Sequence, residues 1–598
     1  MRFCRAIGFL ATIFVVGTLA AQVPPPPQPA ATQSAAPVTS PPPAATFKAA
    51  SRMVAVEVVA RDHQGHPITG LTADDFQVFE QIRGKREQHP QKIAAFRAVS
   101  VADIAAQDKD QLQLPPGVYT NLVSMQKTPV PPTVLLVDGL NTELDSQMRV
   151  HQQMVRMLAS IPEDVPVAVF LLGRHLKMIQ NFTTDPKLLK TTLQKVTIDH
   201  AGDRAQLEPQ DDPDALSAFL ENEPSLPAGS LTSLEQFERD VYAMQMDIRV
   251  QETIDALRTL ARHLVGYPGR KNLLWISSSF PIAINPDIDL SFAGVRNYTD
   301  QMSRLADALA DAKISVYPVD PGGLQVQSAF RASTRMRGSP VMGPHSIGRQ
   351  IEREDQSRFN RQATMQSVAD QTGGIVCVND NDLADCIRKA VSDSSSFYEM
   401  AYYPDSGAWQ GEFHKIVIKS KRSGLRLAYR QGYFAKHDES SEQKSRDFQE
   451  ADCLDYLTST SVLVVAKEYP TDKAGEAKFV TAVYPSTLNF VRNEDGSRGL
   501  TLKYAVCAFD RSGKPLQFMH QDYEAKFNEK EYVEVEAQHG LPHTMVIVPP
   551  PGTVSVRLLV QDLSNGQIGS VNVPYVETTA VATPPAAAGA ATDKPANH

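Results

Sequence analysis

Residues 133–142 read TVLLVDGLNT, and this stretch decides the fold of the region around it. A run of apolar residues ends in one acid, Asp138, which is followed by small and polar residues. Strands that are apolar throughout are buried on both faces, as in a parallel sheet covered by helices. We therefore expect a buried strand that carries a single carboxylate to the edge of such a sheet.

The same pattern repeats on both sides of this strand, with helical periodicity between the strands. Further strands are predicted at 166–173, 176–182, 272–277, 314–320 and 374–378. Helices are predicted at 144–158, 250–266, 302–309, 363–373 and 382–393. Alternating strands and helices predict an α/β domain with a doubly wound, mostly parallel sheet at residues 130–400. One acidic, Pro-bearing segment, residues 198–245, interrupts the rhythm and is predicted to be an inserted loop with at most one short helix.

Strand-like patterns flank this domain on both sides. A small β module is predicted at 47–100, and a β extension at 401–436. A charged linker at 437–454 leads to regular short strands at 455–576, which predict an immunoglobulin-like β-sandwich.

The first 21 residues resemble a cleaved signal peptide, with Arg2 and Arg5 before an apolar core and small residues at its end. An uncleaved anchor is the alternative reading. Pro/Ala-rich segments at 22–46 and 577–598 lack the material for a core. No later stretch is apolar enough to span a membrane, so we expect a periplasmic, outer-surface or extracellular protein.

Charge and cysteine content narrow the options further. The net charge of −9 argues against a nucleic-acid partner, which needs a basic face. An even number of cysteines after cleavage permits disulfides in an exported chain. We predict a bridge between Cys377, in a strand, and Cys386, on the next helix; Cys453–Cys507 is a second candidate.

Five quoted segments resemble a known family. They read ITGLTADDFQVFE, TVLLVDGLNT, YPGRKNLLWISSSFP, VADQTGGIVCVND and YRQGYFA. Together they are similar to the von Willebrand factor A (VWFA) domain, in the divergent branch common in exported acidobacterial proteins. The resemblance covers roughly residues 50–436 and implies a VWFA/Rossmann-like sheet. The C-terminal sandwich resembles a domain often appended in that group.

The resemblance implies binding rather than catalysis, through a metal-ion-dependent adhesion site. In the family, a first loop Asp-x-Ser-x-Ser, a second-loop Thr and a third-loop Asp hold Mg²⁺ or Mn²⁺. Here Asp138 keeps the first acid, Leu140 replaces the first Ser and Thr142 the second. The second-loop position falls at Gln251, with Thr253 as a shifted candidate, and the third-loop Asp position holds Ser277.

A degenerate site follows from these replacements. Mg²⁺ is usually held by one or two carboxylates and several waters, so one carboxylate predicts at most weak Mg²⁺ or Mn²⁺ binding, through Asp138 and Thr142. Alternatively, Asp138 caps the next helix or accepts backbone N–H groups. The edge can still bind a protein partner. The predicted partner-binding residues are Asp138, Asn141, Thr142, Gln251, Thr253 and Ser277.

We expect no enzymatic activity. The sequence has no HExxH, GxSxG, P-loop or CxxC motif. Trp275 is interpreted as a packing anchor. Two alternatives remain: a secreted hydrolase with an unrecognised site, and a structural component of the cell envelope.

Overall fold

The computed structural model divides the chain into two units, Met1–Ala50 and Ser51–His598. The described residues are 53–82, 85–100, 114–122, 130–142, 154, 161–173, 175–195, 228–267, 269–277, 298–320, 359, 362–378, 383–404, 412–435, 445, 448, 457–471, 473, 475–537 and 540–576. The predicted signal peptide, the linker at 22–46 and the tail at 577–598 lie outside them.

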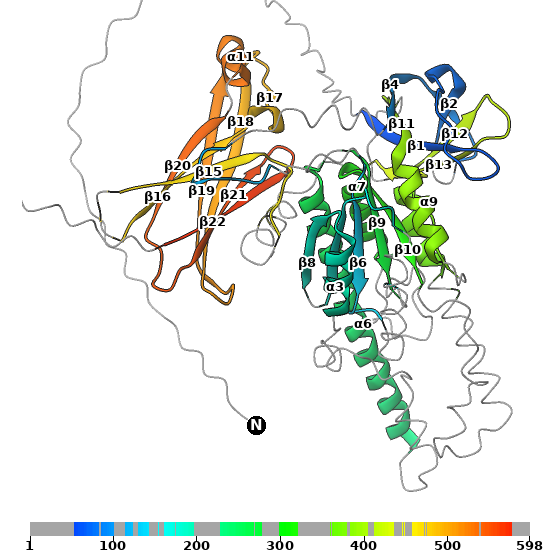
Figure 1. Cartoon of the computed structure of the whole chain (residues 1–598), viewed down its shortest axis with the longest axis horizontal. Coiled ribbons are helices and arrows are strands. Elements are labelled where there is room, and N and C mark those ends of the chain that lie inside the picture. Colours follow the sequence, from blue (N-terminus) through cyan, green and yellow to red (C-terminus); the bar gives the residue numbers. More distant parts are fainter. Residues whose placement is uncertain are drawn as a thin grey trace, which may run out of the picture. The chain divides into compact units, whose positions relative to one another are not determined.

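A five-stranded sheet carries the α/β part of the chain (Figure 1). Its order is β10 (Ile314–Val319), β9 (Lys271–Ile276), β6 (Thr133–Asp138), β7 (Val167–Leu172) and β8 (Leu176–Thr183). All neighbours are parallel except β7 and β8, and the four parallel strands are buried at every residue. This burial is the reason that their sequences are apolar without alternation.

Helices pack on both faces of this sheet. They are α3 (Pro186–Lys195), α6 (Ala228–Leu264), α7 (Thr299–Asp311), a helical stretch at 362–372, and α9 (Leu383–Ser395). Alternate residues of β6 point to opposite cores: Leu136 joins a cluster with residues of α6 and α7, whereas Leu135 joins one with residues of α3 and α9. The sheet is therefore the middle layer of three.

The predicted β module and β extension form one antiparallel unit. One sheet has the order β13 (Arg426–Tyr429), β1 (Val54–Arg61), β11 (Ser396–Tyr402), β4 (Ile93–Ser100). The other has the order β14 (Gly432–Phe434), β12 (Phe413–Ser420), β2 (Phe76–Ile82), β3 (His89–Gln91), with a 3₁₀ turn, η1 (Ala73–Asp75), before β2. The two sheets share one apolar core. Strands more than 300 residues apart in sequence thus pair directly, such as Val56 with Met400.

The C-terminal part consists of two antiparallel sheets around a common core. One sheet has the order β20 (Leu541–Ile547), β16 (Ala477–Val483), β15 (Val464–Tyr469), β5 (Val118–Thr120). The other has the order β17 (Val491–Arg492), β18 (Arg498–Phe509), β21 (Ser555–Asp562), β22 (Ile568–Pro574), and β19 (Pro515–Phe527) also pairs with β18. Short helices η5 (Pro485–Thr487) and α11 (Glu529–Ala537) complete it. The contribution of β5, from far upstream, was not predicted.

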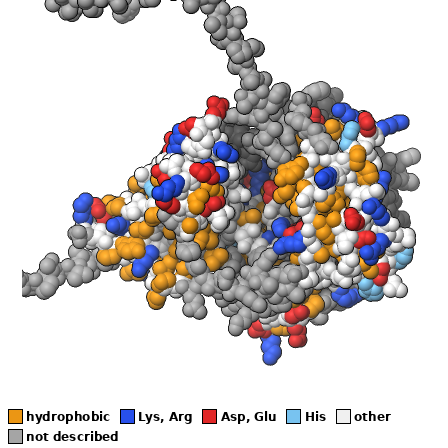
Figure 2. Space-filling model, turned by 90° about the horizontal axis from the view of Figure 1, so that it is seen from above, with side chains coloured by type: hydrophobic (Ala, Val, Ile, Leu, Met, Phe, Trp, Pro, Cys, Tyr) orange, Lys and Arg blue, Asp and Glu red, His pale blue; other side chains and the backbone are white. Residues whose placement is uncertain are grey.

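The chain is thus a mixed α/β protein rich in strands, and its sheets are mostly antiparallel. The prediction of a mostly parallel sheet applies to one of the five sheets. On the face that Figure 2 shows, basic and acidic side chains of the described residues are interspersed, without a large field of one sign.

The loop predicted at 198–245 is wrong for its second half. Helix α6 begins at Ala228, so residues 228–245 are helical; residues 196–227 lie outside the described residues. The apolar periodicity that predicted a helix from Val250 changes face upstream of that residue, which hid the continuation of the helix.

The predicted Cys377–Cys386 disulfide is confirmed, with a Cα–Cα distance of 6.1 Å. Cys507 is disulfide-bonded as well, but Cys453 lies outside the described residues. Within the predicted linker 437–454, Phe448 is buried against Leu559 and its neighbours. None of the helices in the described ranges is long and apolar enough to cross a membrane.

Candidate functional site

The candidate site is built on the carboxyl end of β6. The N–H groups of Gly139 and Leu140 donate to the carbonyl oxygen of Leu172, at 2.9 and 3.0 Å. These bonds fold the chain over the end of β7. They hold the preceding side chain, the carboxylate of Asp138, in a fully buried position.

Both carboxylate oxygens of Asp138 accept hydrogen bonds. The backbone N–H of Asn141 donates to Oδ1 at 2.8 Å, and its side-chain Nδ2 donates to Oδ2 at 2.9 Å. The indole Nε1 of Trp275, on β9, donates to Oδ2 at 2.9 Å. The side chain of Ser277, just past β9, bonds to the same carboxyl group. Four donors thus surround one acid.

Helix α6 closes the network from one side. The Asn141 Nδ2 also donates to Thr253 Oγ1 at 2.9 Å, and that hydroxyl donates to the carbonyl oxygen of Arg249 at 2.7 Å. An NH2 group of Arg249 lies 3.5 Å from Asn141 Oδ1. Asn141 therefore links the end of β6 to two successive turns of α6.

Burial decides the electrostatics of this site. It raises the pKa of Asp138, and it outweighs the hydrogen bonds from Asn141, Trp275 and Ser277, which lower that pKa. A carboxylate enclosed by donors is oriented and satisfied, so it is poorly suited to attack a substrate or to accept a proton from one.

The structure brings four of the six predicted site residues together: Asp138, Asn141, Thr253 and Ser277. Thr142 is fully buried next to them in sequence. Gln251 lies apart from the network, because its side-chain amide donates to Gln301 on α7 at 2.9 Å. Whether these residues bind a partner stays a prediction.

Sequence reasoning missed two members of the network, Trp275 and Arg249. The interpretation of Trp275 as a packing anchor is incomplete, since its ring lies in the core while its N–H reaches Asp138. A buried indole N–H usually finds an acceptor, and this was the available signal. For Arg249 no signal existed, because its position depends on the upstream extension of α6.

The residues present do not fit Mg²⁺ or Mn²⁺. These ions take oxygen ligands, but both oxygens of Asp138 already accept N–H or O–H donors. The indole of Trp275 can only donate, and the side chain of Leu140 is buried in the core. Among the described residues, no group of three or more His, Cys, Asp or Glu could hold a metal.

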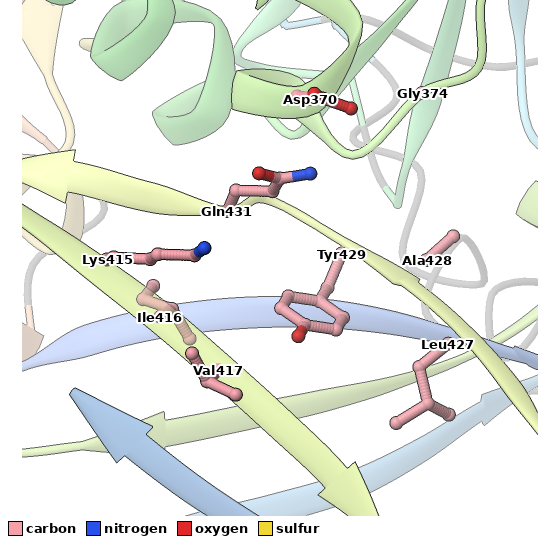
Figure 3. A pocket seen from close by; sticks show the side chains of 9 residues that line it. All are labelled: Asp370, Gly374, Lys415, Ile416, Val417, Leu427, Ala428, Tyr429 and Gln431. Carbon is pink, nitrogen blue, oxygen red and sulfur yellow. The ribbon is translucent and has the colours of Figure 1, made fainter. Parts of the chain in front are cut away.

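A separate cavity of about 370 Å³ lies where the end of the helical stretch 362–372 meets β12 and β13 (Figure 3). Its lining consists of Asp370, Gly374, Lys415, Ile416, Val417, Leu427, Ala428, Tyr429 and Gln431. Asp370 is the only carboxylate in this lining, and the Tyr429 hydroxyl accepts a bond from the Ile418 N–H at 2.9 Å. The convergent acids expected of a hydrolase are absent from this cavity.

The amino end of the same sheet carries ion pairs. Arg270, 1% exposed, donates to the carbonyl oxygen of Gly373 at 2.8 Å and lies 3.4 Å from Glu57 on β1. Asp393 on α9, fully buried, pairs with Arg61 on β1 and accepts the Tyr317 hydroxyl at 3.0 Å. These ion pairs join the antiparallel β unit to the α/β sheet.

Burial and charge oppose each other in this cluster. Burial alone would lower the pKa of Arg270, but Tyr317, Glu57 and Asp393 outweigh it and raise that pKa. For Lys271 the attraction of Glu57 does not outweigh burial, which lowers the pKa of Lys271 to about 7. Its Nζ donates to the carbonyl oxygen of Ala312 at 2.7 Å.

Similarity to known proteins is found among solved structures only. No family profile matches the chain, and no curated protein sequence matches it. One similar solved structure is an aerotolerance-related membrane protein from Bacteroides fragilis NCTC 9343 carrying multiple mutations to serines, at 12% identity and TM-score 0.21. Another is the conserved hypothetical protein BatB from Bacteroides thetaiotaomicron, at 12% identity and TM-score 0.22. Each similarity covers 44% of this chain and 98% of the Bacteroides chain.

A third similar structure is an uncharacterised membrane spanning protein from Vibrio fischeri, at 14% identity and TM-score 0.12. The similarity covers 43% of this chain and 96% of the chain from Vibrio fischeri. With TM-scores this low, none of the three carries an argument about this protein, and the von Willebrand factor A resemblance stays a prediction.

Proposed function

We propose that this chain is an exported, non-catalytic protein-binding molecule with a von Willebrand factor A-type sheet, and that its binding edge works without a metal. One observation carries the proposal. Asp138 ends β6 and Ser277 follows β9, and these are the two neighbouring strands at which the strand order reverses. In open α/β sheets, ligands bind outside the carboxyl ends of the strands at such a switch point.

The strand order supports the A-type assignment. Along the chain the sheet strands are β6, β7, β8, β9 and β10, and in space they run β8-β7-β6-β9-β10. A parallel bridge from Val319 to Cys377 adds a sixth position beyond β10. This arrangement corresponds to the doubly wound order 3-2-1-4-5-6.

The donors around Asp138 support the metal-free, non-catalytic part of the proposal. The N–H of Trp275 and the side-chain amide of Asn141 both donate to Oδ2 of this carboxylate. The network takes over the structural task of a metal, which is to fix the loop after β6 against β9 and α6.

Two features support export. The N-terminal segment has the composition of a signal peptide, and the Cys377–Cys386 bridge is typical of proteins in oxidising compartments.

Site-directed photo-cross-linking in the exporting cell tests the binding edge. A photoreactive amino acid replaces Gln301, which lies on α7 beside Gln251 at the carboxyl edge of the sheet. The matched control replaces Lys389, an exposed residue on α9. We expect a discrete protein adduct from position 301 and none from position 389.

No adduct from position 301 would contradict the proposal. Equal adducts from both positions would instead indicate a component embedded in the cell envelope. No observation among the described residues favours the hydrolase alternative.

A further inference from the structure

The cavity where the helical stretch 362–372 meets β12 and β13 is lined by two opposite charges that do not pair with each other. Asp370 supplies a carboxylate, and Lys415 on β12 supplies an ammonium group. Oδ1 of Asp370 accepts the side-chain amide of Gln366 at 2.8 Å, and no cation of the described residues contacts this carboxylate. The Lys415 ammonium forms neither an ion pair nor a hydrogen bond with any described residue. Both charges can therefore contact a ligand.

Two glycines at the end of the helical stretch position Asp370. Gly373 has a φ of +74°, in the left-handed region that glycine adopts without strain. A Cβ on Gly374 would lie 1.9 Å from the carbonyl oxygen of Val316 on β10, so this close passage requires a glycine. The N–H of Gln431 donates to the carbonyl oxygen of Asp370 at 2.9 Å. The wall that carries Asp370 is thus fixed by backbone contacts.

The opposite wall of the cavity is fixed as well. Strands β12 and β13 belong to different sheets, and the Tyr429 side chain reaches from β13 to β12, where its hydroxyl accepts the Ile418 N–H at 2.9 Å. The N–H of Ile416 donates to the carbonyl oxygen of Gln431 at 2.8 Å. These bonds set the spacing of the two strands. The cavity is therefore preformed, as ligand sites usually are.

Polar and apolar groups lie on different sides of the cavity. Figure 3 shows the polar side chains of the lining on one side and the apolar ones on the other, with the Tyr429 ring between them. The polar side chains are Asp370, Lys415 and Gln431, and the apolar ones are Ile416, Val417 and Leu427. The cavity volume of about 370 Å³ lies in the range of roughly 300–1,000 Å³ of small-molecule sites. The lining fits a small ligand with a charged end and an apolar end.

The two charges decide the class of ligand. Burial raises the pKa of Asp370, and the hydrogen bond from Gln366 lowers that pKa by less. A cation close to Asp370 would favour its charged form. A ligand with only a positive charge would leave Lys415 unpaired, and a ligand with only a negative charge would be repelled by Asp370. A ligand that carries both charges can pair with both side chains.

We propose that this cavity binds a small zwitterion with an apolar side chain, which is the chemistry of an apolar amino acid. The ammonium group of the ligand pairs with Asp370, and its carboxylate pairs with Lys415 and the side-chain amide of Gln431. Its side chain packs on the apolar side of the cavity, against Leu427. The cavity shares no residue with the network around Asp138, so this site and the partner-binding edge are tested separately.

Isothermal titration calorimetry of the full-length protein tests the site with three probes. L-leucine carries both charges, 4-methylpentanoate lacks the ammonium group, and L-leucinamide lacks the carboxylate. We expect L-leucine to bind at least about tenfold more tightly than either of the other two, because each loses one charge-assisted hydrogen bond.

Three variants localise the binding. Asp370→Asn and Lys415→Met should each weaken the binding of L-leucine about tenfold or more. Lys419→Met should leave it unchanged, because Lys419 is an exposed lysine of the same strand that lies outside the lining. Circular dichroism of each variant verifies that the fold is kept.

Three outcomes would overturn the assignment of this site. The first is the absence of any heat of binding with L-leucine at millimolar concentration. The second is equal affinity for L-leucine and L-leucinamide, because Lys415 would then not contact the carboxylate. The third is binding of L-leucine that survives both Asp370→Asn and Lys415→Met, because the ligand would then occupy another place.

Discussion

The two ends of the parallel sheet treat buried polar groups in opposite ways. At the carboxyl end, one acid, Asp138, is surrounded by neutral hydrogen-bond donors, and all of these donors belong to the α/β part of the chain. At the amino end, Arg270, Glu57, Asp393 and Arg61 form ion pairs that reach into the neighbouring β unit. Arg270 and Asp393 are buried, as is Asp138, so burial of charge does not by itself mark a functional site.

The comparison teaches what each kind of polar group does. Ion pairs between two units make their attachment depend on both partners, because each charge is costly to bury alone. A neutral network around one acid instead fixes a loop within a unit. The following predictions test this division, from the largest expected effect to the smallest.

Replacing Arg270 should give the largest loss of stability. Arg270→Met leaves Glu57 without its cation and the Gly373 carbonyl without a donor, so we expect about 4–5 kcal/mol of destabilisation. Urea unfolding followed by circular dichroism measures it. In Glu57→Met combined with Arg270→Met, part of this loss should be recovered; a double variant as unstable as the sum would contradict the pairing.

Lys271 should make stability depend on pH. Its pKa of about 7 in the folded protein lies below the unfolded value of about 10.4, so the unfolded chain binds more protons between these limits. The free energy of unfolding should therefore rise by about 3–4 kcal/mol from pH 7 to pH 10, relative to Lys271→Met. The free energy of unfolding of the wild type and of Lys271→Met is measured across this pH range. A difference between the two proteins that stays constant from pH 7 to pH 10 would refute this prediction.

Removing Asp138, at the carboxyl end of the sheet, should lower the free energy of unfolding by less. Asp138→Ala leaves the N–H donors of Asn141 and Trp275 without their acceptor, and we expect a loss of about 3 kcal/mol. Mg²⁺ or Mn²⁺ should leave the melting temperature of the wild type unchanged. A metal-dependent rise in melting temperature that disappears in Asp138→Ala would restore the metal site.

Trp275→Phe should have the smallest effect. It keeps most of the packing but removes one donor to Asp138, so we expect a loss of about 1.5 kcal/mol. A double-mutant cycle with Asp138→Ala separates the hydrogen bond from the ring. A coupling energy of zero would show that Trp275 acts through packing alone.

The parallel strands were predictable because their burial on both faces left a direct mark on the sequence. Asp138 was found for the same reason, since it stands where an apolar run ends, whereas Ser277 was found through the resemblance to the von Willebrand factor A domain. The start of α6 could not be predicted, because the apolar residues of this helix change face near Ile248 and no single periodicity runs through it. The pairing of β1 with β11 was hidden as well, since strand partners far apart in sequence share no local signal.

The part that Trp275 plays could not be read from its position alone. Its neighbours on β9 predict burial, but only the packed structure shows that its N–H reaches the carboxylate on β6. Likewise, three residues of β5 are too few to predict a strand, and they are ordered through their pairing with β15.

Helix α9 ends at Ser395, and β11 begins at the next residue. No loop separates them. Near its start α9 is held by the Cys377–Cys386 disulfide, and near its end by the ion pair of Asp393 with Arg61. The antiparallel β unit and the edge of the parallel sheet are therefore connected in series through α9, and a force applied to β11 would be transmitted to Cys377.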